Sequence, residues 1–452
     1  MLEMMEWKKL LSSKRLCQPS APQPHLARSQ FQIDYDRICF SSAFRRLQDK
    51  TQVFPLPGND YVRTRLTHSL ECSSVGRSLG ANVGKELLLA KHVDGEYTAR
   101  DFGDVVAAAC LAHDIGNPPF GHTGEDALRH WFIKSPAGDY IRRHLDNPCH
   151  RADLWNYEGN AQGFRLLTKL LSPSNSGGIR LTCATLSTFS KYPKNSAATG
   201  GNYKQEKYGF FDADKELFEE VATETGLLRV NEHCWVRHPL AFLVEAADDI
   251  CYHIVDIEDG FKLGCLGFQE TCDLLTSISG ETERKSSEFR EKEYIEYARS
   301  KAIGAMVSAV TKMFLDNYER IMSGDYTGEL AIDSHLGENF STLKKVAKKK
   351  VYSHKSVVEV EAAGFNVLGT LMSIFFESVE DKYASHIKNV PTSPWCRTIL
   401  KLIPESYVGS DYIPADSVYL RALMIFDYVS GMTDSYAVST YKKVQGISLL
   451  QG

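Results

Sequence analysis

Apolar residues recur at helical spacing along most of this chain, and long runs that alternate every second residue are nearly absent. Val75, Leu79, Val83 and Leu87 follow one another at steps of four, which places them on one face of a helix. Similar patterns recur from Asp34 to the end, in 102–113, 217–224, 240–256, 302–317, 357–377 and 418–429. We therefore predict an all-α fold, with room for short hairpins within 180–211.

The composition is that of an ordinary globular protein, with 43% hydrophobic and 24% charged residues in 452 and a formal net charge of −5. This charge offers no global attraction to nucleic acid or an anionic membrane. The 11 cysteines include no Cys-x-x-Cys pair, which indicates buried thiols in a reducing compartment. No signal-peptide run opens the chain, and the longest clean apolar run, 105–112, is too short to span a bilayer. We predict a cytoplasmic protein without membrane contact.

Two imidazoles and two carboxylates have the order expected of a divalent-metal site: His68, the adjacent pair His113 and Asp114, and Asp248. The pair ends an apolar helical run that breaks in Gly-Asn-Pro-Pro, so it should face a cleft. A buried structural histidine is the alternative for either imidazole taken alone. The mixed donor set suits one ion of borderline hardness: we expect Mn²⁺ or Mg²⁺, with Fe²⁺ or Zn²⁺ as alternatives.

Six stretches extend this pattern into a family resemblance: 44–56, 62–71, 112–125, 157–165, 245–252 and 427–434. In this order they resemble the HD-domain deoxyguanosine triphosphate triphosphohydrolases, and they are spread over most of the chain, from about residue 33 to 445. The resemblance implies a metal-dependent enzyme that hydrolyses dGTP, or other dNTPs, to deoxynucleoside and inorganic triphosphate. It also implies a homo-oligomer of four or six subunits, with single-stranded DNA or a nucleotide effector as further partners.

The residues of a phosphohydrolase site can then be assigned. His122 and Glu125 stand three apart, and the resemblance makes them the catalytic pair. His122 either protonates the departing alkoxide oxygen, which is a poor leaving group, or assists the attacking water. A capping Glu beside a helix-terminal His is the structural alternative. The resemblance places Gln52 and Asn160 against the substrate, Tyr252 against the deoxyribose and Asp256 at its 3′-hydroxyl. Asn117 departs from the family, where many members carry His, so no second phosphate-binding imidazole is predicted there.

Cationic side chains are also required, because the carboxylate ligands neutralise the charge of the metal ion. The negative charge of a nucleotide triphosphate must then be balanced by other groups. Arg65, Lys191 and Lys207 are the candidates, joined by the aromatic Tyr192. The last three lie in a Gly/Ser/Asn-rich segment, 172–209, that also carries Lys194 and Lys204. This segment is either a mobile surface loop or a loop that closes over a polyphosphate. A basic cluster at 344–350 could contact phosphate or a nucleic acid, but it is more typical of a solvated or subunit-contact helix.

We divide the chain into an N-terminal arm (1–30), an HD phosphohydrolase core (31–270) with a small irregular insertion around 172–209, and additional C-terminal helices (271–452) packed on the core. Two other functions compete with a dNTP triphosphohydrolase. One is another HD-type nucleotide phosphohydrolase, a nucleotidase or phosphodiesterase. The other is a non-catalytic protein that senses nucleotides or binds single-stranded nucleic acid, for which the His122 and Glu125 pair would have no use.

Overall fold

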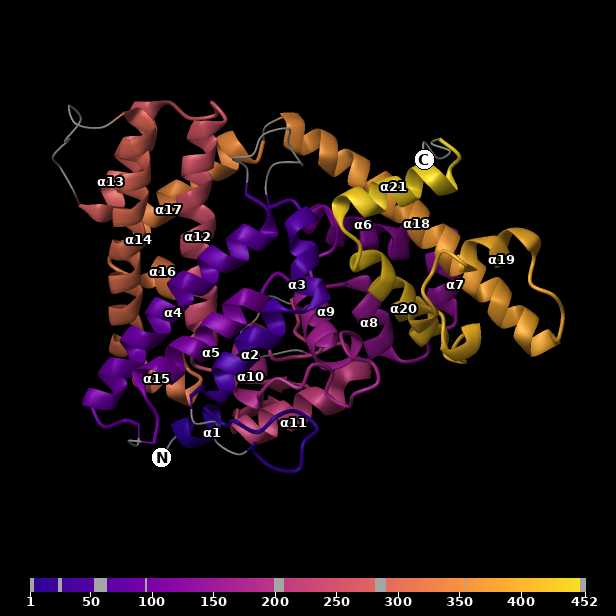
Figure 1. The fold of residues 1–452 in the computed structure, drawn as a ribbon, viewed down its shortest axis with the longest axis horizontal. Helices are drawn as coiled ribbons and strands as arrows, with labels where there is room; N and C mark the ends of the chain where they lie inside the picture. The colour runs from indigo at the N-terminus through magenta and orange to yellow at the C-terminus, as the bar shows by residue number, and fades with distance from the viewer. Residues whose placement is uncertain are drawn as a thin grey trace.

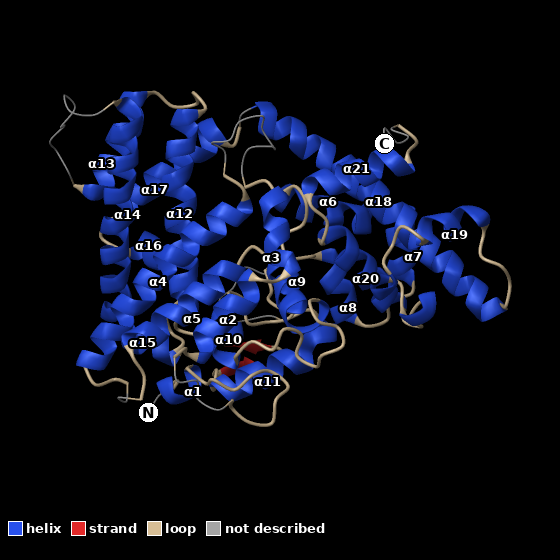
Figure 2. Cartoon of the chain, in the orientation of Figure 1, coloured by secondary structure: helices blue, strands red, loops and turns tan. Residues whose placement is uncertain are grey.

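The computed structural model describes residues 4–22, 27–52, 63–93, 96–198, 207–280, 290–353 and 355–447. Over these residues the regular secondary structure is almost entirely helical, which confirms the predicted all-α fold (Figures 1 and 2). The strands within the described part are β1 (Arg229–Asn231) and β2 (Cys234–Trp235), which pair as an antiparallel hairpin. This hairpin lies outside 180–211, where helix α10 stands instead.

The helices follow one another along the chain without a repeated unit. Those of the first part are α1 (Trp7–Leu10), α2 (Gln30–Cys39), α3 (Ser42–Arg46), α4 (Arg65–Leu89), α5 (Ala99–Ala112), α6 (Gly121–Lys134), α7 (Pro136–Arg143), α8 (Pro148–Trp155), α9 (Gly159–Arg165), α10 (Cys183–Phe189), α11 (Lys215–Thr225) and α12 (Ala241–Lys262). Those that follow are α13 (Phe268–Ser279), α14 (Glu291–Asp316), α15 (Tyr318–Ser323), α16 (Leu330–Asp333), α17 (Gly337–Val346), α18 (Lys355–Lys388), α19 (Pro394–Leu400), α20 (Val418–Ser430) and α21 (Asp434–Val444).

A first hydrophobic cluster forms around α4, α5 and α12, on the left of Figure 1. The predicted stripe from Val75 to Leu87 is buried in it, so the periodicity identified the correct helix face. The two helices α4 and α5 approach closely at Gly80, where a Cβ would lie 2.6 Å from the carbonyl oxygen of Phe102. The close packing continues toward His113, since a Cβ on Gly76 would lie 2.5 Å from Cys110 Sγ.

A second cluster joins α6 and α7 to α18 and α20, on the right of Figure 1. Leu128 and Trp131 of α6 pack there with Leu371 and Phe426. Each cluster draws residues from both sides of residue 270, and the first also buries Trp7 of the N-terminal arm. The division at 1–30, 31–270 and 271–452 stays a prediction.

Within the described part of the chain, one helix is long and apolar enough to span a membrane. It covers Val358–Lys388, and its most apolar window of 18 residues has a mean hydropathy of 1.4. Half of its most apolar window is buried inside the protein, and α18 packs against α6, α19 and α20. Such burial is typical of the core helix of a folded domain, and here the helix supplies the second cluster with Leu371, Phe375 and Phe376.

The segment 172–209 is packed into the protein over most of its described length. Every residue of α10 is buried, and Thr182 caps this helix by accepting from the Thr185 backbone N–H at 3.2 Å. Thr182 in turn donates from N–H and Oγ1 to the buried carboxylate of Asp34, which also pairs with Arg15 at 2.6 Å. Among the described residues of this segment, 172–176 keep the character of a surface turn. Lys204 lies outside the described residues.

Candidate active site

Three helices bring His68, His113 and Asp248 together. His68 lies in the first turn of α4, His113 is the C-cap of α5, and Asp248 lies in the middle of α12. Asp248 Oδ1 is 3.0 Å from His68 Nε2 and 3.4 Å from His113 Nε2. One carboxylate oxygen therefore reaches both imidazoles, although Asp248 is well over a hundred residues away in the sequence.

The donor set fits a divalent cation. His113 Nδ1 lies 2.6 Å from the Cys110 carbonyl oxygen, to which it can only donate, so Nε2 is the nitrogen that would bind a metal when the ring is neutral. That Nε2 is buried and has no hydrogen-bond partner within the described part of the chain. Burial would lower the pKa of His113, but the carboxylates of Asp114 and Asp248 outweigh it and raise the pKa to about 9. The two carboxylates therefore favour positive charge at His113 Nε2, carried either by a proton or by a bound cation.

Asp114 is positioned differently from the other predicted ligands. Its Oδ2 accepts from Arg65 at 2.7 Å, and its Oδ1 accepts from the Asn117 amide at 2.5 Å. The same Oδ1 lies 3.5 Å from His113 Nε2. Burial would raise the pKa of Asp114, but Arg65 and the two histidines together lower it to about 2. Asn117, the departure from the family pattern, serves here to hold this carboxylate.

The turn after His113 requires glycine. A Cβ on Gly116 would lie 2.1 Å from the Gly159 carbonyl oxygen, and one on Gly121 would lie 2.5 Å from Arg65 Nη2. Gly121 also has a φ of +61°, following Phe120 at +64°, a left-handed pair that starts α6 at a sharp angle. The turn therefore packs against α9 at Gly116 and returns the chain so that His122 faces the metal ligands.

His122 and Glu125 form the predicted pair on the first turn of α6. His122 Nδ1 lies 3.3 Å from Glu125 Oε2, and Glu125 Oε1 accepts from the Gly159 N–H at 2.8 Å. The hydrogen bond to Glu125 raises the pKa of His122. Burial alone would raise the pKa of Glu125, but His122 and the cations Lys207 and Arg129 lower it to about 2. An ionised, buried carboxylate thus orients an imidazole that opens onto the cavity.

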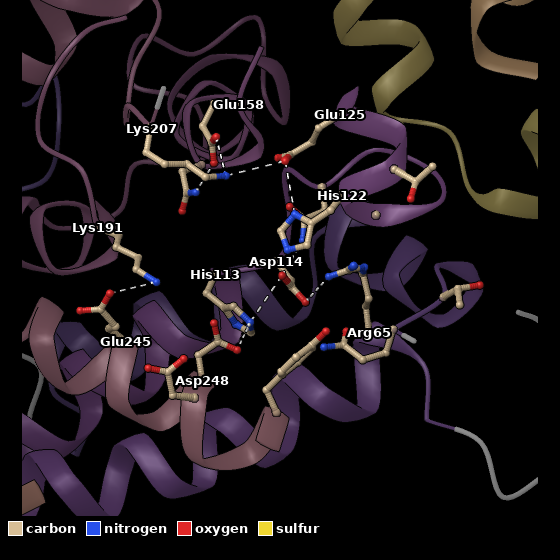
Figure 3. Close-up of a pocket in the computed structure, with 18 of the residues that line it drawn as sticks. Arg65, His113, Asp114, His122, Glu125, Glu158, Lys191, Lys207, Glu245 and Asp248 are labelled. Atoms are coloured by element: carbon tan, nitrogen blue, oxygen red, sulfur yellow. Dashed lines mark hydrogen bonds and ion pairs between the residues drawn. The ribbon is translucent and has the colours of Figure 1, made fainter. Parts of the chain in front are cut away.

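One cavity of about 420 Å³ contains most of the predicted site, as Figure 3 shows. The predicted residues that line it are Gln52, Arg65, His113, Asp114, His122, Glu125, Asn160, Lys191, Tyr192, Lys207, Asp248 and Tyr252. His68 is buried on the far side of Asp248. Asp256 does not line the cavity: it is buried and accepts a hydrogen bond from the hydroxyl of Tyr352, which does line it.

Carboxylates partner the predicted cations around the cavity. Lys191 lies 3.1 Å from Glu245, and Lys207 lies 2.8 Å from Glu158, while Arg65 holds Asp114 (Figure 3). An anionic ligand would share these cations with their carboxylates. Lys194, by contrast, is buried outside the cavity wall.

Sequence reasoning missed several residues of the cavity wall. Lys344, Tyr352, Val360 and Glu361 reach it from α17, α18 and the turn between them, and Asp249 reaches it from α12. Lys344 belongs to the basic cluster that we assigned to a solvated helix, and its exposure agrees with that. No motif marks these positions, so only the packing of α17 and α18 on α12 could reveal them.

The sequence matches the family model described as HD domain over residues 65–153, which include every predicted site residue from His68 to Glu125. A deoxyguanosinetriphosphate triphosphohydrolase-like protein of Synechocystis sp. is 44% identical over 98% of this chain and 100% of its own. The chain belongs to the deoxyguanosinetriphosphate triphosphohydrolase-like family. This family membership confirms the resemblance seen in the six motifs.

Two further members of the family show its range. A deoxyguanosinetriphosphate triphosphohydrolase-like protein of Pseudomonas aeruginosa is 37% identical over 98% of this chain and 99% of its own. A deoxyguanosinetriphosphate triphosphohydrolase of Klebsiella pneumoniae is 31% identical over 92% of this chain and 94% of its own. The likeness thus extends well beyond the HD match, over α12 and the C-terminal helices that complete the cavity.

Proposed function

We propose that this chain is a metal-dependent dNTP triphosphohydrolase that converts dGTP, or another dNTP, and water into deoxynucleoside and inorganic triphosphate. The observation that carries the proposal is the single cavity in which an imidazole–carboxylate cluster, the His122 and Glu125 pair and three cations face one another. Its volume of about 420 Å³ is within the range of small-molecule sites. Membership of the family supports the same chemistry.

The metal ligands in this proposal are His68, His113, Asp114 and Asp248. The first two and Asp248 already converge, and Asp114 Oδ1 lies 3.5 Å from His113 Nε2. A bound Mn²⁺ or Mg²⁺, with Fe²⁺ or Zn²⁺ as alternatives, would supply Lewis-acid polarisation of a phosphate oxygen and lower the pKa of water. Because Arg65 holds the other oxygen of Asp114, it would steady this carboxylate and also face the phosphates.

His122 supplies the proton in this mechanism. Its raised pKa favours the imidazolium form, which can donate to the departing 5′-oxygen of the deoxyribose. Glu125 keeps the ring oriented through Nδ1, which leaves Nε2 directed toward the substrate. We therefore assign His122 as the general acid and Glu125 as the residue that orients it.

The remaining cavity residues bind the substrate. Lys191 and Lys207, with Tyr192 between them, would contact the triphosphate from the segment that follows α10. Gln52 and Asn160 would contact the nucleotide from opposite walls. Tyr252 would pack against the deoxyribose and exclude a 2′-hydroxyl, while Asp256 would act on the 3′-hydroxyl through Tyr352.

We also propose the compartment, the oligomeric state and the effectors of the enzyme. All 11 cysteines are free thiols, which agrees with a reducing cytoplasm. We propose a homo-oligomer of four or six subunits, to be checked by light scattering of the purified protein. Single-stranded DNA or a nucleotide would act as an effector, to be checked by adding each to the assay.

The decisive experiment identifies the products. Metal-loaded protein is incubated with each of the four dNTPs and with GTP, and the products are separated by ion-pair chromatography. We expect deoxynucleoside and intact triphosphate from at least one dNTP and little turnover of GTP. Deoxynucleoside monophosphate with pyrophosphate, or diphosphate with phosphate, as first products would refute the proposed reaction.

A further inference from the structure

Lys50 is a buried lysine next to the cavity wall. It directly precedes Thr51, which lines the cavity, and only 3% of Lys50 is exposed. Its Nζ donates to two backbone carbonyl oxygens, that of Asn117 at 2.5 Å and that of Ser430 at 3.0 Å. A buried amino group is costly without acceptors, so these two hydrogen bonds determine where the side chain ends. The lysine therefore joins the turn after His113 to the end of α20.

Both oxygens of Asp114 are held by residues that Lys50 contacts. The side chain of Asn117 donates to Asp114 Oδ1 at 2.5 Å, and the carbonyl of the same Asn117 accepts from Lys50 Nζ. Arg65 donates to Asp114 Oδ2 at 2.7 Å, and the backbone N–H of the same Arg65 donates to the Lys50 carbonyl oxygen at 3.1 Å. Lys50 is thus one hydrogen bond away from each residue that orients this carboxylate.

We propose that Lys50 is a positioning residue for the metal site and acts on the ligand Asp114 through Asn117 and Arg65. An Asp carboxylate can turn about two side-chain bonds. In the proposed site its Oδ1, which lies 3.5 Å from His113 Nε2, faces the cation while Oδ2 stays with Arg65. Partners that hold both oxygens before the ion arrives strengthen metal binding. The inference rests on the metal site of the proposed function, but not on the reaction catalysed there.

The anchor for Lys50 lies at the corner between α20 and α21. Ser430, which accepts from Lys50 Nζ, is the last residue of α20 and lies 380 positions away in the sequence. Asp434, the first residue of α21, accepts from the backbone N–H groups of Thr51 and Phe120. The corner therefore holds both Lys50 and the turn that Lys50 contacts. In this way the C-terminal helices shape a metal site to which they give none of the proposed ligands.

Manganese binding to the metal-free protein measures this positioning. The full-length protein is stripped of metal and titrated with Mn²⁺, and the unbound ion is followed by its electron paramagnetic resonance signal. Lys50→Met keeps a long unbranched side chain but cannot donate to either carbonyl. Since loss of an outer-shell partner typically costs about 10- to 100-fold in metal affinity, we expect the Kd for Mn²⁺ to rise by about tenfold or more. An unchanged Kd in Lys50→Met would overturn the inference.

Lys194→Met is the matched control. Lys194 is also a buried lysine, with 1% exposed, but it lies outside the cavity wall. Its replacement should leave the Kd for Mn²⁺ unchanged, whatever it does to urea unfolding. An equal rise in both variants would show that the loss reflects general destabilisation, which contradicts the proposed role of Lys50.

A double-mutant cycle tests whether the side chain of Lys50 acts through Asn117. Asn117→Ala removes the amide that holds Asp114 Oδ1, and it should raise the Kd for Mn²⁺ by about tenfold or more. If the lysine acts through this amide, Lys50→Met should add little to the loss that Asn117→Ala already causes. Losses that multiply in the double variant would show that the two residues act independently and would refute the relay.

A second substitution keeps the test open if Lys50→Met does not fold. Lys50→Gln retains a polar donor, but its amide ends one bond short of the position of Nζ, so the contacts with Asn117 and Ser430 should weaken. We expect a smaller rise in the Kd for Mn²⁺ than in Lys50→Met. Native-like Mn²⁺ binding in Lys50→Gln, with Lys50→Met unfolded, would overturn the inference.

The outcomes separate this inference from the proposed function. Native-like Mn²⁺ binding in Lys50→Met overturns the positioning role and leaves the proposed metal site intact. A native protein that binds Mn²⁺, loses affinity in Lys50→Met and hydrolyses no dNTP keeps the positioning role and refutes the proposed reaction. A native protein that binds no Mn²⁺ overturns both.

Discussion

His122 stands at the mouth of the cavity, with its side chain 77% exposed and Nδ1 held by Glu125. If it transfers a proton and does not bind metal, His122→Ala should keep a near-normal metal content. Turnover should fall on the order of 10²-fold or more, as expected for loss of a general acid. Metal analysis and steady-state kinetics check this, and loss of bound metal in the variant would instead make His122 a ligand.

The pH profile tests the role of Glu125. The hydrogen bond to Glu125 raises the pKa of His122, against the opposing charges of Arg65 and Lys207. The imidazolium therefore persists to higher pH, and general-acid activity is lost as pH rises through this raised pKa. Glu125→Gln removes the negative charge, so the alkaline fall in kcat should move to lower pH. An unchanged alkaline limb would show that another group controls it.

Neighbouring carboxylates on α12 should differ in their effect on the metal. Asp248 Oδ1 contacts both imidazoles, whereas Asp249 is turned about 100° around the helix and interacts with Lys191. We expect Asp248→Ala to lose tight metal binding and activity, and Asp249→Ala to keep its metal. Metal content of the two purified variants settles the assignment. The reverse result would move the proposed ligand to Asp249.

At the scale of elements, the start of α21 holds the two loops that lead to Gln52 and His122. The buried carboxylate of Asp434 accepts from the Thr51 N–H at 2.9 Å and from the Phe120 N–H at 3.0 Å. Asp434→Ala leaves both donors without this acceptor, which should cost roughly 1–3 kcal/mol of unfolding free energy. We expect kcat to fall while metal content is kept, because His122 follows Phe120 closely.

Ser435→Ala is the matched control for Asp434→Ala. It removes an exposed hydrogen bond to Asp49 from the next position of the same helix. Its effect on urea unfolding and on kcat should be small. A fall in stability with unchanged kcat in Asp434→Ala would limit this carboxylate to a structural role.

The elements that sequence could predict are those whose pattern repeats over several turns. The stripe of α4 and the apolar runs of α5, α12 and α20 gave correct helices, because each buries one face or nearly all of itself. Helix α10 was not predicted, because it is buried on all sides and its sequence therefore shows no separate apolar and polar faces. Tyr352 and Lys344 escaped it because they reach the cavity through tertiary packing alone.

The same limit applied to the ligands. His68, His113 and Asp248 were recognisable from residue type and order, and the structure brings them together. The bond of Asp256 to Tyr352 was hidden, because a helix-face argument places Asp256 beside Tyr252 but says nothing of what covers it.

At the scale of the whole molecule, a buried ion network lies where the two hydrophobic clusters meet. Arg165, at the end of α9, donates to Asp427 of α20 at 2.9 Å and to Asp214 before α11 at 3.0 Å. Its neighbours Phe164 and Ala161 belong to the first and the second cluster, respectively. The network therefore connects α9 to the C-terminal helices. Helix α9 also carries Asn160 and packs against the turn that follows His113.

Breaking this network should destabilise the whole protein. Asp427→Ala leaves Arg165 buried with one carboxylate instead of two and also removes the acceptor of Gln162. Removing one partner of a buried pair typically costs about 3–5 kcal/mol, and Asp214, which remains, should keep the loss near the lower figure. Asp126→Ala, which breaks an exposed pair with Arg129, should cost no more than about 1 kcal/mol. Urea unfolding of both variants measures the difference, and equal losses would show that the Arg165 network does not join the two clusters energetically.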